Sequence, residues 1–220
     1  MLIATQRLAE RPAIAVDVPD LATAYIKTST WSYISKSAIL ENTENVSLGS
    51  KSIIKGDARL ASGSAHIRIG RSCTIGSGAV FAPPSLEDPP SSPPPSASSP
   101  PLPPPPSASY LPMTIGPNTS IGARCDVRAA SIGANCVLEA GVLVGRRAII
   151  KDNVHVLANS VLPPDSFYPP FSVVAGNPAK IVQMNNESWP EVRKIEVRRL
   201  YALWVNGAEE QDLAIDDYDV

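Results

Sequence analysis

The 220-residue chain contains few of the residue types on which several classes of protein depend. It has three cysteines, and this odd count argues against a disulfide framework and for a reducing compartment. Its two histidines leave few candidates for metal binding or acid–base catalysis. No run approaches the roughly 20 apolar residues that a membrane-spanning helix needs. No basic run of the kind that neutralises phosphates is present, so we expect no binding to nucleic acid.

The chain does contain a regular spacing of aliphatic residues, which return at every sixth position. A helix places apolar residues every three or four positions and a half-buried strand every second, so neither fits a period of six. A short strand followed by a bend, repeated many times, does fit it. The predicted core residues are Ile69, Ile75, Ile115, Ile121, Ile132, Leu138, Val144, Ile150, Val156 and Leu162.

The position four residues after each aliphatic is nearly always small. This joint pattern is typical of the hexapeptide repeat of a parallel β-helix, in which three hexads form a triangular coil and about six coils stack. We expect the small residue to lie inside a corner, and the glycine that often follows the aliphatic to adopt a conformation that other residues resist. The small positions are Ser52, Ala58, Ser64, Cys73, Ala79, Thr119, Cys125, Cys136, Val142, Ala148, Val154, Ser160, Ser166 and Ser172.

All three cysteines occupy this small position, so we expect them to be buried and chemically inert. A reactive thiol would need an accessible, electropositive setting.

Changes in composition divide the chain into six segments. The step of nine between Leu60 and Ile69 indicates a three-residue insertion. The run "PPLPPPP" at 100–106 is a candidate ligand for a proline-recognition module of the SH3, WW or EVH1 kind. The segments are a variable N-terminal extension (1–22), a first β-helix block (23–82), a Pro/Ser-rich low-complexity loop insertion (83–112), a second β-helix block (113–184), a C-terminal amphipathic helix (187–205) and an acidic tail (206–220).

The C-terminal helix has a clear start signal and a predicted apolar face. Ser188 and Glu191 form a capping box, and Pro190 suits a first helical turn. We expect the helix to pack back along the prism. At 100° per residue its apolar face would contain Trp189, Val192, Ile195, Leu200, Leu203 and Trp204.

The repeat, with "IIKGDARL" (53–60) and "AGNPAKIV" (175–182), resembles the hexapeptide-repeat superfamily, which includes acyltransferases and γ-class carbonic anhydrases. This resemblance implies an all-β fold, a left-handed parallel β-helix of hexapeptide repeats with a C-terminal α-helix. Aligned with the carbonic anhydrase-like motifs, Ala82, Ala123 and Arg128 stand at the zinc-ligand positions, so we expect neither metal nor cofactor. The acyltransferases use a histidine as general base. His66 is the candidate here, whereas His155 precedes an inward residue and should point outward.

Three stretches, 25–60, 67–84 and 161–181, resemble the dynactin subunit 5 family more closely. That resemblance implies a non-catalytic scaffold of the dynactin pointed-end complex that supports dynein-driven microtubule transport and the engagement of adaptors and cargo such as endosomes. The implied partners are dynactin subunit 6 (a sister β-helix), the pointed-end actin-related protein and the p62-type subunit. The implied location is the cytoplasm and cytoskeleton, with no membrane insertion. Two alternatives stay open: a hexapeptide-repeat acyltransferase, and a degenerate γ-carbonic-anhydrase-like homotrimer.

We name five candidate partner contacts and no catalytic residue. Arg146, Arg147 and Lys151 concentrate positive charge, which fits either a solvated corner or a contact with an acidic partner surface. Trp189 and Trp204 are the two aromatic candidates.

Overall fold

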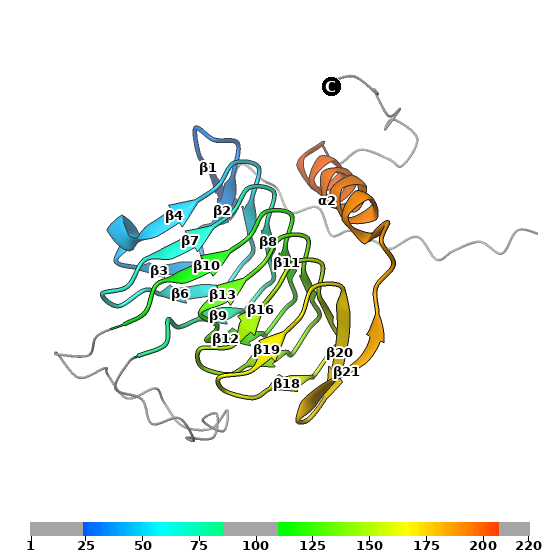
Figure 1. Cartoon of the computed structure of the whole chain (residues 1–220). Helices are drawn as coiled ribbons and strands as arrows, with labels where there is room; N and C mark the ends of the chain where they lie inside the picture. Colours follow the sequence, from blue (N-terminus) through cyan, green and yellow to red (C-terminus); the bar gives the residue numbers. More distant parts are fainter. Residues whose placement is uncertain (1–23, 86–109, 207–220) are drawn as a thin grey trace, which may run out of the picture.

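A computed structural model describes residues 24–85 and 110–206 of the chain, and most of these residues form short parallel strands wound into stacked coils (Figure 1). Six coils of three strands each form a prism with three sheet faces, which we call A, B and C. The strands of face A and its end hairpins are β1 (Tyr25–Lys27), β2 (Tyr33–Ser35), β5 (Ile53–Ile54), β8 (Thr74–Ile75), β11 (Ser120–Ile121), β14 (Val137–Leu138), β17 (His155–Val156), β20 (Ser172–Gly176) and β21 (Ala179–Met184). Face B contains β3 (Ile39–Glu41), β6 (Arg59–Ala61), β9 (Val80–Phe81), β12 (Asp126–Val127), β15 (Leu143–Val144) and β18 (Val161–Leu162). Face C contains β4 (Val46–Leu48), β7 (Ile67–Ile69), β10 (Met113–Ile115), β13 (Ser131–Ile132), β16 (Ile149–Ile150) and β19 (Phe167–Tyr168).

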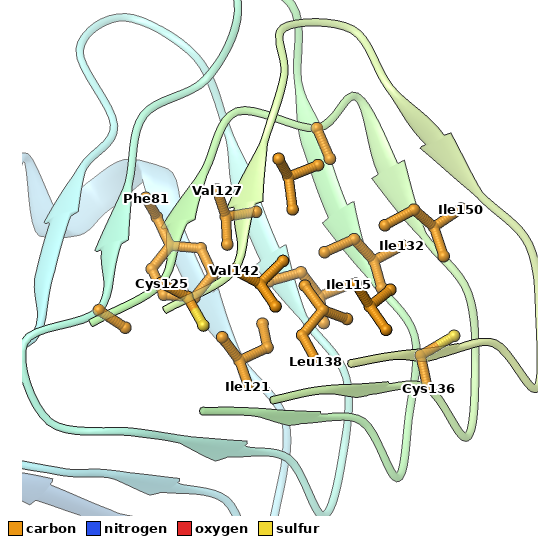
Figure 2. Packing of buried hydrophobic residues seen from close by; sticks show 14 of the residues in the cluster. Phe81, Ile115, Ile121, Cys125, Val127, Ile132, Cys136, Leu138, Val142 and Ile150 are labelled. Atoms are coloured by element: carbon orange, nitrogen blue, oxygen red, sulfur yellow. The ribbon is translucent and has the colours of Figure 1, made fainter. Parts of the chain in front are cut away.

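The aliphatic residues of successive coils stack in register inside the prism. Ile115 lies between Ile69 and Ile132, its partners in the adjacent parallel strands. All ten aliphatics of the predicted core are at most 2% exposed. Figure 2 shows several of them in the same interior with Phe81, Cys125 and Cys136. Burial of each such side chain contributes on the order of 1.5–3 kcal/mol, which explains why the six-residue period determines the fold.

Most bends use a left-handed residue at a fixed place, three positions after the aliphatic, although none follows Val127. Asn118, Asn135 and Asn153 have φ values of 56°, 55° and 63°, and Gly78 and Gly141 occupy the same place in other coils. Asparagine and glycine adopt this conformation most readily.

The glycine directly after the aliphatic has a different role from the one we expected. Among the described residues, Gly70, Gly116 and Gly122 do not have positive φ. A Cβ at Gly116 would lie 2.5 Å from the backbone of Gly133 and Ala134 in the next coil. The prediction of unusual backbone conformation was therefore wrong, and close contact between coils is the reason for glycine.

The three-residue insertion after Leu60 changes the phase of one corner. Ser64, predicted to be an inward small residue, is exposed, whereas Ser62 and Ala65 are buried. The Ser62 hydroxyl donates a hydrogen bond of 2.7 Å to the carbonyl oxygen of Glu41 in the coil below. The same corner carries the short helix η1 (Thr43–Asn45) in the first coil.

The prism ends are formed by two antiparallel hairpins. Strand β1 pairs with β2, and β21 pairs with β20. The repeat begins in β2, with Ile34 and Leu40 stacked in phase, two strands before the clear sequence pattern at Leu48 in the same coil.

Helix α2 (Trp189–Asn206) runs along face A toward the first coil (Figure 1). Its length suits this position: 15 residues from Trp189 to Trp204 rise about 22 Å. The five strand spacings from β17 to β2 measure about 24 Å.

The predicted apolar face of this helix was partly wrong. Val192, Ile195 and Leu200 are between 45% and 60% exposed, whereas Arg193, Val197 and Trp204 are buried. The buried face is thus rotated around the helix relative to the prediction, because Arg193 is included in the contact with the sheet.

The extension 1–22, most of the Pro/Ser segment 83–112 with its 100–106 run, and nearly all of the tail 206–220 lie outside the described residues. Within residues 24–85 and 110–206, no helix is long and apolar enough to cross a membrane.

Candidate functional site on the faces of the prism

The two histidines lie in different surroundings. His66 is exposed in the bend before β7, and its carbonyl oxygen accepts the Met113 N–H in the next coil. His155 points outward from face A, as expected, but α2 covers it. Its Nε2 lies 2.8 Å from Glu139 Oε1, and its ring stacks on Trp189 with 5.4 Å between the ring centroids.

The Glu139–His155–Trp189 cluster joins the helix to the sheet. Glu139 Oε2 accepts a hydrogen bond from the Ala158 N–H at 2.9 Å. Trp189 Nε1 donates a hydrogen bond of 2.9 Å to the carbonyl oxygen of Asn135. Since His155 is held on one side by a carboxylate and on the other by an indole, this arrangement positions α2.

The residues at the zinc-ligand positions of the carbonic anhydrase-like motif make other contacts. The Ala82 N–H donates to the carbonyl oxygen of Val127, and the Ala123 carbonyl accepts from the Gly141 N–H. The Arg128 guanidinium pairs with both carboxylate oxygens of Asp126, at 3.1 and 2.9 Å. Among the described residues, no three His, Cys, Asp or Glu side chains lie together as a metal site would require.

The cysteine thiols are buried in the prism corners. Burial raises the pKa of Cys73 to about 11 and that of Cys136 to about 12. Burial also raises the pKa of Cys125. The Sγ atoms of Cys73 and Cys125 lie 3.2 and 3.0 Å from carbonyl oxygens of the next coil, those of Gly116 and Glu139. At neutral pH the thiols therefore stay protonated and unreactive.

Helix α2 covers face A, and the apolar pattern of its sequence predicted only some of the side chains that contact this face. Arg193 is 2% exposed, and it donates to Ser120 Oγ at 2.8 Å and pairs with Glu196. Trp204 is buried against Tyr25 and Tyr33, so it is not available as the partner contact that we predicted. A charged residue at an inward helix position carries no sequence signal by itself.

Face B is largely apolar, and no helix of the described residues 24–85 and 110–206 covers it (Figure 1). The residue before each inward aliphatic points outward, and on this face those residues are Ile39, Arg59, Val80, Asp126, Leu143 and Val161. Four of the six are apolar, and the two charged residues are paired, Arg59 with Glu41 and Asp126 with Arg128. The sequence does carry a signal for this face, because the residue before the aliphatic is apolar in four of the six hexads that form it, but the six-residue period by itself does not reveal this.

A hollow of about 200 Å³ lies on the C-terminal half of face B. It is lined by Leu143 and Val161 together with Arg128, Arg146 and Pro178, the last from the β20–β21 turn. The hollow lies over the strands β12, β15 and β18 of face B.

The three predicted cationic contacts do not form one cluster. Arg146 lines the hollow of face B, and Arg147 Nε donates to Asp165 Oδ1 at 2.6 Å. Lys151 lies beyond β16, at the next corner, with Nζ 5.8 Å from the centroid of the Phe167 ring. Hydrogen bonding to Arg147 lowers the pKa of the Asp165 carboxyl.

Outward residues on face C are more polar than those on face B. They are Ser47, Arg68, Thr114, Ser131, Ile149 and Phe167, of which two are apolar. Of the three faces, A is covered by α2, C is mainly polar, and B has the composition of an interaction surface.

Two solved structures share the fold. A hexapeptide transferase family protein from Anaplasma phagocytophilum superposes with a TM-score of 0.57 and 18% identity, over 80% of this chain and 93% of that one. PerB from Caulobacter crescentus, solved with CoA and GDP-perosamine, superposes with a TM-score of 0.50 and 20% identity, over 69% of this chain and 57% of PerB. At these identities the likeness shows the fold alone.

The family model of dynactin subunit 5 matches residues 99–203. The matched segment contains the second β-helix block, the hollow of face B and most of α2. The resemblance seen in the sequence is therefore confirmed: over residues 99–203 the chain matches the dynactin subunit 5 family, and its described residues fold as a hexapeptide-repeat β-helix.

Proposed function

We propose that the chain is a non-catalytic scaffold subunit of the dynactin pointed-end complex. The observation that carries this proposal is the family match over residues 99–203. In this role the protein supports dynein-driven microtubule transport and the engagement of adaptors and cargo such as endosomes, in the cytoplasm and on the cytoskeleton. Its partners are dynactin subunit 6, the pointed-end actin-related protein and the p62-type subunit.

Face B supports a role based on shape and surface. Its outward apolar residues Val80, Leu143 and Val161 are half-buried. Leu143 and Val161 lie on adjacent strands, about 4.8 Å apart, and Val80 lies two strands from Leu143. A second β-helix has the same distance between neighbouring strands, so its side chains can fit between these outward residues. The outward charges on the strands of face B, Arg59 and Asp126, are already paired within the chain, which favours an apolar partner surface over a strongly charged one.

The proposal is tested by purifying the tagged chain from its own cells and identifying partners by mass spectrometry. We expect recovery of the actin-related protein, the p62-type subunit and dynactin subunit 6. Recovery of the chain only as a homotrimer would contradict the proposal and favour the acyltransferase alternative with His66. The variant Leu143→Glu should lose the sister β-helix, whereas the control Thr114→Glu, on face C, should retain it. Retention by both would remove face B as the contact.

The arginine corner provides a separate prediction. Reversing the charge of both Arg146 and Arg147 to glutamate should weaken recovery of partners, because Arg146 borders the hollow and Arg147 loses its pair with Asp165. An exposed ion pair contributes about 0.2–1 kcal/mol, so the melting temperature should change little. Unchanged recovery of partners would show that Arg146 and Arg147 face solvent and make no contact with a partner.

A further inference from the structure

One corner column of the prism begins with a residue that does not suit its backbone conformation. At the corner between faces C and A, a left-handed residue stands three positions before each inward residue of face A, with φ between 55° and 63°. The residues of this corner column are Trp31, Lys51, Ser72, Asn118, Asn135, Asn153 and Phe171. A bulky residue is a rare outlier in this conformation, whereas asparagine adopts it readily. The bend alone therefore does not explain the tryptophan.

Hydrogen bonds fix the loop that contains Trp31, between β1 and β2. The Trp31 N–H donates to the Thr28 carbonyl oxygen at 3.2 Å. The Trp31 carbonyl oxygen accepts a hydrogen bond from the Tyr201 hydroxyl of α2. The neighbouring Thr30 carbonyl oxygen accepts one from the Lys51 N–H at 3.1 Å. The helix and the second coil thus hold the loop before any partner binds, which lowers the entropic cost of binding.

The indole ring of Trp31 is presented to solvent. Trp31 is 58% exposed, whereas Trp204 is buried against two tyrosines. Lys27 Nζ lies 3.8 Å from the centroid of the Trp31 ring, as in a cation–π contact. A ring this exposed adds little to the core, and tryptophan is enriched among the residues that dominate binding at protein interfaces. Trp31 is thus a candidate anchor for a partner.

The side chains beside Trp31 are basic. Lys27 stacks on the ring, and Lys51 is exposed at the next position of the corner column. On α2, exposed Arg198 lies three residues before Tyr201, so it is on the side of the helix that contacts the Trp31 loop. Positive charge therefore borders the exposed indole.

The acidic residues of this region lie at another corner or are paired. Residues 24–48 have no net charge, because two lysines balance Glu41 and Glu44. Those two glutamates lie at the end of β3 and in η1, toward the corner between faces B and C. On α2, the carboxylates of Glu191 and Glu196 pair with basic residues of the same helix. The charge beside Trp31 therefore complements a partner surface that carries carboxylates.

We propose that Trp31, Lys27 and Lys51, which we call the Trp31 surface, dock a partner protein that offers an apolar pocket bordered by Asp or Glu carboxylates. The indole fills the pocket, and the two ammonium groups pair with the carboxylates. The Trp31 surface lies at the corner between faces C and A, apart from face B. The proposal does not depend on the proposed function, because it does not depend on which protein supplies the pocket.

The test uses the tagged full-length chain, purified from its own cells with its partners, and quantitative mass spectrometry. Trp31→Asn should keep its melting temperature, because asparagine has the same backbone conformation at 118, 135 and 153. We expect this variant to lose one partner protein by about tenfold or more. The control Phe171→Asn removes an aromatic residue from the other end of the same corner column, and it should retain that protein.

Charge reversal tests the chemistry of the same partner. Lys27→Glu combined with Lys51→Glu should lose the protein that Trp31→Asn loses. The control combines Lys36→Glu with Lys180→Glu, two exposed lysines at other places, and should retain it. Raising the salt concentration to about 0.5 M should weaken the retention of this protein by the unmodified chain.

Four outcomes would overturn the proposal. The first is full retention of every partner by Trp31→Asn. The second is an equal loss in Phe171→Asn. The third is retention, by the variant with Lys27 and Lys51 reversed, of the protein that Trp31→Asn loses. The fourth is binding of the purified chain to phosphatidylserine vesicles that Trp31→Asn abolishes without the loss of any protein, which would identify a lipid surface as the occupant.

Discussion

The glycine after each stacked aliphatic is a contact residue between coils. In Gly116 the absent Cβ leaves room for the backbone of Gly133 and Ala134, and Gly122 does the same for Glu139 and Ala140. The sequence shows that glycine recurs at this place, but it shows neither the distance to the next coil nor the φ value. Those depend on how closely two coils stack, which is a property of the assembled prism.

Gly116→Ala should therefore destabilise the protein by about 1–3 kcal/mol, because a methyl group would have to displace backbone atoms 2.5 Å away. Urea unfolding followed by circular dichroism measures the change. The control is Gly78→Asn. Gly78 has φ of 67°, and the nearest atom to its Cβ is 3.6 Å away, so asparagine should be accepted as it is at 118, 135 and 153. Equal losses in both variants would contradict the contact argument.

The buried thiols give the stability a defined dependence on pH. The unfolded thiols have an ordinary pKa near 9.0, whereas in the fold the pKa is about 11 for Cys73 and about 12 for Cys136. Between these values the unfolded state loses protons that the folded state keeps, so the free energy of unfolding should fall as the pH rises above about 9.

Replacing the three cysteines by serine, which occupies the same corner position at 52, 160 and 172, should remove this part of the pH dependence. Denaturant unfolding at pH 8 and pH 10.5 measures it. A thiol reagent at pH 8 should label all three cysteines after unfolding and none in the native protein. Rapid labelling of the native protein would contradict burial as the cause.

At the scale of the element, helix α2 shows what periodicity can and cannot predict. The start and length of α2 were predictable from local sequence, and so was its return along the prism. The predicted capping box does not form, because the Ser188 N–H donates to Asn186 Oδ1 at 3.2 Å and the Glu191 carboxylate pairs with Lys194.

The buried face of α2 was not predictable, because Arg193 enters the interface by pairing with Glu196 and Ser120, while Val192 and Ile195 stay exposed. A prediction from the hydrophobic pattern of one helix assumes that charged residues face water. Here Arg193 faces the sheet instead, because the Ser120 hydroxyl accepts a hydrogen bond from it.

Trp204→Ala should destabilise the protein by about 3–5 kcal/mol, because it removes a ring packed on Tyr25 and Tyr33. Ile195→Ala, on the same helix, should change the free energy of unfolding by less than about 0.5 kcal/mol, since that side chain is 60% exposed. Chemical denaturation of both variants tests the corrected helix face. A larger loss for Ile195→Ala would restore the original prediction.

The Pro/Ser insertion leaves and rejoins the prism at one corner. Phe81 and Met113, on either side of it, pair with the same neighbouring coils, and Ser85 and Tyr110 form an antiparallel bridge at its base. Deleting 86–109 with a short linker should leave the melting temperature almost unchanged, because both strands keep their partners. Thermal unfolding by calorimetry measures this. A large drop would show that the deleted residues stabilise the prism.

At the scale of the molecule, the sequence allowed the β-helix to be predicted, but it did not allow face B to be recognised as a surface. A six-residue period, small corner residues and one helix signal are local patterns, and each coil repeats them. The outward residues of face B, such as Val80 and Leu143, come from every third hexad and are far apart in the sequence. They can be recognised as one surface only when the coils are stacked and α2 is seen to cover face A (Figure 1). Arg146 and Lys151, close in sequence, lie at different corners for the same reason.

The central claim, that this β-helix acts as one subunit of a heteromeric assembly, is tested most directly by the native mass of the protein in extracts of its own cells. Size-exclusion chromatography with immunodetection is sufficient. We predict that the chain elutes with the actin-related protein in a particle far larger than three copies of the 23.3 kDa chain, about 70 kDa. Elution of all the protein near 70 kDa, without actin-related protein, would contradict the claim and indicate a homotrimer.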